Sequence, residues 1–143
     1  MINSTEKFLL LVDILKTTEI EFQDFKVIQL SQAILESGWG TSDLFLKFNN
    51  PFGLKFRREM KYLADSVSYK NDSYCHFCCL LSAVKGYWRF IERPVYSGFR
   101  ECSNSLEFLD HIVNAGYAGS SEKIQADYIN KIQKIIPKAL ELL

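Results

Sequence analysis

The sequence predicts a mainly α-helical protein of the α+β class, with five to six helices and one small β-hairpin. Three observations lead to this class. Apolar residues recur at helical spacing in several segments, and residues that cap helices stand at the ends of those segments. Only a short stretch in the middle of the chain has the composition and alternation of strands. No repeat and no flexible linker interrupts the pattern, so we expect a single domain over residues 1–143.

Length and charge exclude several classes of protein. The chain has 143 residues, and its 17 basic and 17 acidic side chains give a net charge of zero. Proteins that bind nucleic acid through its phosphates usually carry a basic excess, so we expect no such partner. No apolar run approaches the roughly 20 residues of a membrane span. A hydrophobic content of 48% excludes disorder and suits a packed core, in a protein that we expect to be a monomer.

The first expected helix begins at Ser4 or Thr5, either of which can cap it, and ends near Thr17. Lys7 and the five apolar residues that follow it look like the start of a secretion signal. The apolar run is too short for a signal, however, and Asp13 interrupts it. We therefore expect a folded helix here and no signal peptide.

A second, mostly buried helix is expected from about Asp24 to Gly38, because glycine favours a helix end. Ser42 can cap a short third helix that runs through Phe48. The segment 49–51 should form a bend, since the residue before a proline avoids the helical conformation.

The hairpin is expected from residues 66–69 and 73–77, with the polar segment 70–72 as its tip. Helical spacing returns at Ser82 and stops before Pro94. The middle of the chain therefore supplies the β part of the fold and one further helix.

Two more helices are expected near the C-terminus. Ser103 can cap the first of them, and Gly116 stands where a left-handed residue commonly ends a helix. Ser121 can cap the last long helix, whose apolar stripe runs from Ile124 to Ile136 with Pro137 after it, and whose polar face includes Lys138.

The cysteines do not form an obvious disulfide framework, because three are crowded together and one is remote. They are Cys75, Cys78, Cys79 and Cys102. The run around His76 has zinc-ligand residue types, but a closed zinc site needs a second paired half and the sequence has none. We expect a strand rather than a metal site, and no cofactor. Free thiols favour synthesis in a reducing compartment.

Glu36 is the first candidate for chemistry. It comes at the end of an apolar helix and three residues before Trp39, which we expect to pack behind it. Partial desolvation would raise the pKa of the carboxyl, as a general acid near neutral pH requires. Such an acid suits glycoside cleavage, because the glycosidic oxygen must be protonated to leave. The alternative is an ordinary glutamate at a helix end.

A wider motif bears on this choice. Residues 31–55 read SQAILESGWGTSDLFLKFNNPFGLK. They resemble the bacterial glucosaminidase family, the family-73 glycoside hydrolases of flagellar and autolytic type, whose hallmark reads A-L-E-S-G-W-G and then N-N-L-F-G-I-K. Residues 109–136 resemble the family's G-Y-A block and final helix, and residues 74–91 resemble its strand and following helix, so the resemblance covers nearly the whole chain.

The resemblance implies a lysozyme-like fold with a groove between helical lobes and the hairpin as one wall. It also implies hydrolysis of the β-1,4 bond after N-acetylglucosamine in the glycan strands of peptidoglycan. Glu36 would be the general acid and Tyr117 an active-site tyrosine, whereas Tyr128 is expected in the core. The residues expected to bind substrate are Asn50, Phe52, Gly53 and Tyr69. Such an activity requires access to the cell wall or periplasm.

The chain departs from the family at one important position. Many members carry a second glutamate in a T-x-E motif on the hairpin, where this chain has Ser68. Three explanations remain open: Asp65 moves into the groove, the substrate's 2-acetamido oxygen attacks in its place, or the protein only binds glycan or assists assembly. We favour the second. A lytic transglycosylase or muramidase is disfavoured, because the G-L-M-Q-like motif is absent.

Overall fold

The computed structural model describes residues 2–143, and it confirms the mainly α class with one hairpin. The α-helices are α1 (Ser4–Thr17), α2 (Lys26–Ser37), α3 (Asp43–Phe48), α4 (Leu80–Ile91), α5 (Ser105–Asn114) and α6 (Glu122–Leu142). The strands are β1 (Ala64–Tyr69) and β2 (Asp72–Phe77). Four single-turn 3-10 helices connect them: η1 (Gln23–Phe25), η2 (Arg58–Met60), η3 (Pro94–Tyr96) and η4 (Phe99–Glu101).

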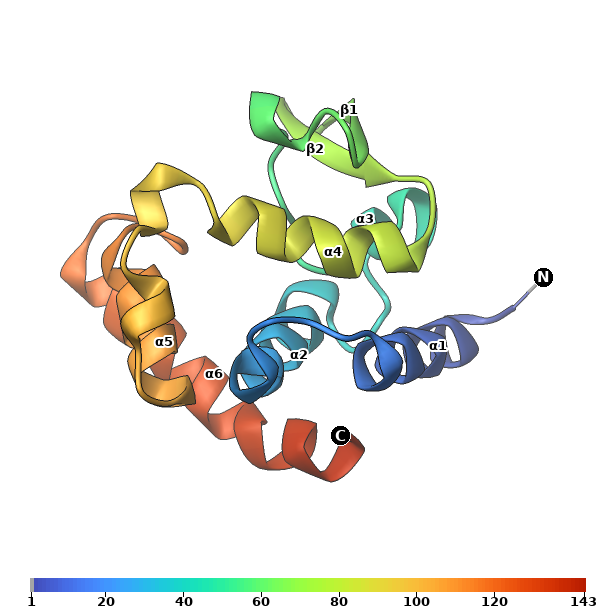
Figure 1. Cartoon of the computed structure of the whole chain (residues 1–143). Coiled ribbons are helices and arrows are strands. Elements are labelled where there is room, and N and C mark those ends of the chain that lie inside the picture. The colour runs from blue at the N-terminus through green and yellow to red at the C-terminus, as the bar shows by residue number, and fades with distance from the viewer. Residues whose placement is uncertain (1) are drawn as a thin grey trace.

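Helix α2 lies in the middle of the molecule (Figure 1). It packs against α6, α1 and α5, and α4 in turn contacts α1 and both strands. The hairpin lies on the side of α4 that faces away from α2 and α6 (Figure 1). The segment between α2 and β1 therefore has to pass beside α4, and this segment supplies part of the candidate site.

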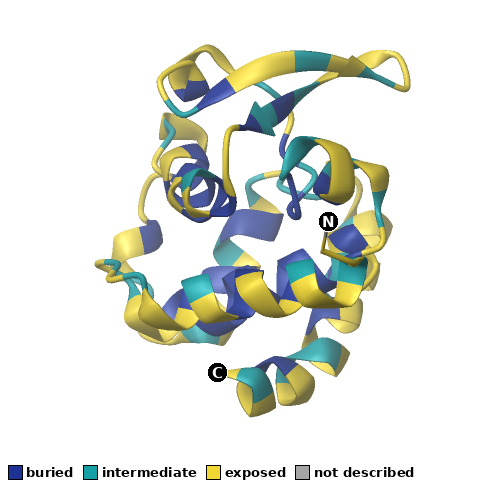
Figure 2. Ribbon diagram, turned by 90° about the vertical axis from the view of Figure 1, so that its right-hand side faces the viewer, coloured by how far each residue is buried: buried dark blue, intermediate teal, exposed yellow. Residues whose placement is uncertain are grey.

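The buried residues lie on the inward faces of the helices, and the outer faces and the hairpin tip are exposed (Figure 2). One continuous apolar cluster runs from Phe8 to Ala139. Ten of the twelve residues of α2 are buried, and five of these are polar or charged: Lys26, Gln29, Ser31, Gln32 and Ser37. Buried glutamines need hydrogen-bond partners inside the protein, and this requirement becomes important for the site.

Four side chains cap helices, and two of them are the serines predicted. The side chains of Ser42 and Ser121 accept hydrogen bonds from the first turns of α3 and α6. The caps predicted for α1 and α5 were wrong by one residue. Asn3 caps α1 in a capping box, and Asn104 caps α5, because each asparagine side chain reaches the backbone N–H three residues later.

The boundaries of α2 and the start of α4 lie within two residues of the predicted positions. Gly38 ends α2 in the left-handed conformation, with φ +57°, as predicted. The N-terminal turn predicted near Asp24 is a 3-10 helix, and the α-helix begins two residues later at Lys26. Helix α4 begins at Leu80, ahead of the Ser82 predicted, although Cys79 provides no side-chain cap.

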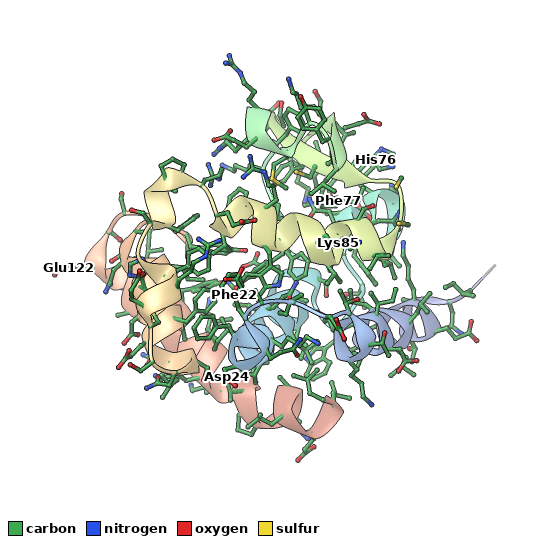
Figure 3. All side chains as sticks on the ribbon, in the orientation of Figure 1. Phe22, Asp24, His76, Phe77, Lys85 and Glu122 are labelled. Carbon is green, nitrogen blue, oxygen red and sulfur yellow. The ribbon has the colours of Figure 1, made fainter. Side chains whose placement is uncertain are left out.

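The hairpin is slightly longer than predicted. Its turn consists of Lys70 and Asn71, both with positive φ, as a two-residue hairpin turn of type I′ requires. Asp72 therefore begins β2 rather than belonging to the tip. The labelled side chains of β2 alternate (Figure 3): Phe77 is fully buried against α4, and His76 lies on the other side of the strand. A β-carbon at Gly86 of α4 would overlap the Phe77 ring, so this glycine lets the hairpin dock.

Pro137, which follows the predicted apolar stripe, lies inside α6. Proline in a helix interior removes one hydrogen bond and costs about 3 kcal/mol. Ala139 is fully buried beyond it, and Leu142 packs against the core, so burial of the last turns offsets that cost. Among the residues described, none of the helices combines the length and the apolar character that crossing a membrane requires.

Candidate active site

A cavity of about 610 Å³ opens where five segments meet. These segments are the end of α2, the loop 52–57, the segment from the end of α4 to η3, the loop 115–119, and the first half of α6. Its lining includes Glu36, Phe52, Gly53 and Tyr117, which are four of the seven site residues expected from the sequence. The cavity is therefore the candidate active site.

Glu36 is the next-to-last residue of α2, so the helix end holds its side chain at the cavity. Glu36 is an exposed residue by its accessible surface, yet enough protein atoms lie around its carboxyl for desolvation to raise the pKa of Glu36. A hydrogen bond from the Tyr128 hydroxyl and the positive charge of Lys131 act in the opposite direction but do not cancel the effect. A raised pKa is the property that a general acid near neutral pH needs.

Tyr117 follows α5 and packs against Phe90, Tyr96 and Tyr128. Its hydroxyl is buried and, among residues 2–143, has no hydrogen-bond partner. Burial raises the pKa of Tyr117 well above its ordinary value, so the hydroxyl keeps its proton. A buried donor without a partner is unusual in a folded protein, and here it belongs to a residue that lines the cavity.

Asn50 does not line the cavity but supports the loop that does. It is only 1% exposed. Its side chain donates hydrogen bonds to the carbonyls of Leu54 and Cys75 and accepts one from the Leu54 N–H, each 3.0 Å long. These bonds close the loop tightly around Phe52 and Gly53 and tie it to β2.

Asp65 and Tyr69 lie on β1, and neither lines the cavity. Asp65 is exposed and stands opposite His76 in the hairpin. The Tyr69 hydroxyl donates a hydrogen bond to Asp43, 3.1 Å away. Glu36 is consequently the one carboxylate among the described residues that line the cavity.

Two residues near Glu36 were not predicted from the sequence. Tyr128 was assigned to the core and Lys131 to a solvated face, and both lie there, but Tyr128 also lines the cavity and both lower the pKa of Glu36. A tyrosine in the apolar stripe of a helix gives no local signal for such a role. Trp39, expected behind Glu36, instead packs on Phe8 of α1, with ring centroids 5.8 Å apart, and is half exposed.

The cavity wall also carries positive charge. Lys55, Arg57 and Arg93 line it, and Lys55 forms an ion pair with Asp72 at 2.8 Å. Among residues 2–143, neither arginine forms an ion pair. Burial lowers the pKa of Arg93 and the neighbouring Arg57 adds to this, whereas Glu59 acts in the opposite direction without pairing. Two unpaired guanidinium groups beside a cavity attract anions.

All four cysteines are free thiols, and Cys75 is buried, which raises its pKa to about 12. Within residues 2–143, no group of three or more His, Cys, Asp or Glu side chains is arranged to hold a metal ion. The polar side chains that line the cavity carry carboxyl, hydroxyl, amino and guanidinium groups.

Comparison with known proteins defines the class of this chain. The glucosaminidase family model, described as mannosyl-glycoprotein endo-beta-N-acetylglucosaminidase, matches residues 14–141. The chain therefore belongs to the glucosaminidase family, and the resemblance predicted from residues 31–55 is confirmed. Membership places it among domains of the glycoside hydrolase kind, whose substrates are glycans.

A particular relative is Protein bax from Escherichia coli (strain K12), which is 35% identical to this chain over 86 residues. The match covers 59% of this chain and 30% of the relative, so the chain spans less than a third of the length of that protein. No solved structure matches the chain, and the lysozyme-like arrangement stays a prediction.

Proposed function

We propose that this protein hydrolyses peptidoglycan, cutting the β-1,4 bond after N-acetylglucosamine with Glu36 as the general acid. The observation that carries the proposal is a desolvated carboxyl with a raised pKa on the wall of a 610 Å³ cavity. Glu36 would donate its proton to the glycosidic oxygen as the bond to the anomeric carbon breaks.

The nucleophile in this proposal comes from the substrate. Glu36 is the sole carboxylate among the described lining residues, so the two-carboxylate mechanisms lack their second group. The 2-acetamido oxygen would attack the anomeric carbon and form a ring, while the leaving sugar takes the proton of Glu36. Glu36, now a carboxylate, would then deprotonate the water that opens the ring. The Tyr117 hydroxyl, which is buried without a partner among residues 2–143, would hydrogen-bond the acetamido group once substrate binding turns it toward the cavity.

The cationic wall supports peptidoglycan over a neutral glycan. Peptidoglycan carries carboxylates on its lactyl and peptide substituents, whereas chitin carries none. Arg57 and Arg93 line the cavity without a carboxylate partner among residues 2–143, so a substrate carboxylate would complete an interaction that the protein leaves open.

The test is product analysis with Glu36→Gln. The matched control is Glu19→Gln, because Glu19 is exposed and lies outside the cavity lining. Purified peptidoglycan is digested and the new reducing ends are identified by mass spectrometry. We expect N-acetylglucosamine ends from the wild type and the control, and roughly 10²–10⁴-fold slower release from Glu36→Gln. Rapid release by that variant contradicts the proposal.

A second candidate function follows from the missing carboxylate. If the wild type binds glycan strands but releases no reducing ends, the chain is a glycan-binding or assembly protein that has lost catalysis. In that case Glu36→Gln would leave glycan affinity nearly unchanged, because the carboxyl would no longer have to transfer a proton.

A further inference from the structure

Three buried side chains form a continuous hydrogen-bonded chain whose last member lines the cavity together with Glu36. The Tyr87 hydroxyl of α4 donates to Gln32 Oε1, and Gln32 Nε2 donates to the Tyr128 oxygen at 3.0 Å. The Tyr128 hydroxyl in turn acts on the Glu36 carboxyl and lowers its pKa. Gln32 and Tyr87 are fully buried, and Tyr128 is 7% exposed.

This chain has a direction, because the amide in its middle has one accepting and one donating end. Gln32 uses its carbonyl oxygen to accept from Tyr87, so only its N–H₂ can face Tyr128. The Tyr128 oxygen therefore accepts, and its single proton is left to donate to Glu36. One carboxyl oxygen of Glu36 is then an acceptor, and the transferable proton must reside on the other oxygen.

We infer that Tyr128 donates its proton to Glu36, and that Gln32 is a positioning residue, which acts through Tyr128 to hold the carboxyl in one orientation and to fix which oxygen carries the proton. The inference rests on the proposed function, in which that proton is transferred. Neither Gln32 nor Tyr87 lines the cavity, so neither is placed to touch substrate.

Gln29 provides a matched comparison within the same helix. It lies one turn earlier in α2, is also fully buried, and also uses both ends of its amide. Its Nε2 donates to the Val84 carbonyl, and its Oε1 accepts from Trp88 Nε1, both at 3.0 Å. These bonds end in the backbone and in an indole, so they hold α4 against α2 without reaching Glu36.

The hydrogen-bonded side chains also determine the direction in which the pKa of Glu36 should shift when they are changed. The hydrogen bond from Tyr128 stabilises the carboxylate and lowers its pKa, as does Lys131 on the same helix. Tyr117 faces the carboxyl from the loop after α5 without a bond to it. The cationic side chains on the cavity wall stay unchanged in the variants below. Removing the Tyr128 hydroxyl should therefore move the titration of Glu36 to higher pH.

The experiment follows the carboxyl carbon of Glu36 by NMR titration of protein labelled with ¹³C-glutamate, assigned by its loss in Glu36→Gln. Four variants are compared with the wild type: Tyr128→Phe, Gln32→Met, Tyr87→Phe and the control Gln29→Met. We expect the midpoint to rise most in Tyr128→Phe, less in Gln32→Met, least in Tyr87→Phe, and to stay in place in Gln29→Met. The alkaline limb of the kcat/KM profile should follow, and kcat in Gln32→Met should fall roughly 10- to 100-fold.

An unmoved midpoint in both Tyr128→Phe and Gln32→Met overturns the inference, and so does an equal rise in Gln29→Met. If Tyr128→Phe and Gln32→Met do not fold, the midpoint in Tyr87→Phe decides, because this substitution removes one hydroxyl and keeps the ring. An unmoved midpoint in Tyr87→Phe then overturns the inference. The midpoint is measured without substrate. If the variants move the midpoint but the wild type shows no turnover, the inference about the hydrogen bonds is supported. The proposed hydrolysis, in contrast, fails.

Discussion

Gly53 lies directly against Glu36. A β-carbon at position 53 would stand 3.5 Å from Glu36 Oε2 and 4.0 Å from its Cβ, and the glycine has φ +62°. The loop that follows Asn50 can therefore pass beside the carboxyl without covering it, in a backbone conformation that other residues adopt at a cost. This contact brings the glutamate motif and the N-P-F-G motif together at the cavity.

The first prediction is that Gly53→Ala lowers both stability and activity. The left-handed conformation should cost about 1–2 kcal/mol, and the added methyl group should lie in van der Waals contact with the carboxyl and reduce its access to substrate. Gly98→Ala is the control, because Gly98 also has a positive φ of +93° but lies outside the cavity lining. Chemical denaturation and release of reducing ends should separate the two effects: both variants lose stability, and only Gly53→Ala loses turnover.

The second prediction concerns stability against pH in Glu36→Gln. Burial raises the pKa of Glu36 above its ordinary value of 4.5, so the folded protein binds this proton more tightly than the unfolded chain does. The stability contributed by that proton is present below pH 4.5 and is lost as the pH rises through the raised pKa. Glu36→Gln should therefore have a higher Tm than the wild type at pH 8, and this gain should shrink by pH 4.

Circular dichroism melts at pH 4, 6 and 8 measure this difference, with Glu19→Gln as the exposed control. A Tm difference between Glu36→Gln and the wild type that is constant over this range would contradict the burial of the charge. A gain in Tm that grows toward acid pH would mean that the pKa of Glu36 is lowered in the folded protein, opposite to the expected direction.

The third prediction is that Tyr117→Phe separates stability from function. A buried hydroxyl without a partner costs about 1–3 kcal/mol, so its removal should leave the free energy of unfolding unchanged or raise it by up to that amount. Activity should fall, because the hydroxyl proposed to hold the acetamido group is gone. Tyr87→Phe should instead destabilise, since the buried Tyr87 hydroxyl donates a hydrogen bond to Gln32 Oε1. Urea unfolding of both variants measures the two changes in the free energy of unfolding.

The fourth prediction addresses the cationic wall. Arg93→Gln should raise KM for peptidoglycan fragments while leaving KM for neutral N-acetylglucosamine oligomers nearly unchanged, and salt should weaken binding of the acidic fragments by the wild type. Arg89→Gln, an exposed position one turn earlier in α4, is the control. Equal losses on acidic and neutral substrates would mean that Arg93 holds the cavity wall by its stacking on Phe90, 3.9 Å away, rather than by its charge.

The fifth prediction separates the two sources of the second catalytic group. Asp65→Asn should change activity little, because Asp65 is exposed on β1 and outside the cavity lining. A thiazoline mimic of the cyclised acetamido intermediate should inhibit far more strongly than N-acetylglucosamine, since a catalytic site complements species close to its transition state. A deep loss in Asp65→Asn, together with weak inhibition by the thiazoline, would favour a moving carboxylate instead.

The part of the site that sequence motifs describe was largely predictable. Glu36, Phe52 and Gly53 belong to one continuous stretch, and Tyr117 belongs to a second motif, so short patterns place them without knowledge of the fold. The structure brings these four together at one cavity. Asp65 and Tyr69 were inferred from a hairpin whose position relative to the groove no local pattern contains, and the structure places both elsewhere.

The remaining differences arise from tertiary packing. Pro137 reads as a helix stop, and only burial of the following turns explains why α6 continues through it. The role of Tyr128 depends on a contact with Gln32, on another helix 96 positions earlier. Helical periodicity identifies which residues face inward, but it does not say which inward-facing tyrosine meets a buried amide.

That separation of 96 positions has a consequence for how the protein is made. A ribosome delivers α2 long before α6, so Gln32 leaves the exit tunnel without the hydroxyl that will accept its N–H₂ group. Burying the amide at that stage would leave a polar group unpaired, which disfavours final packing of α2 until α6 arrives. The acid of the cavity therefore gains its complete surroundings only when the last helix docks, and a nascent chain that stops before α6 carries Glu36 in an unfinished setting.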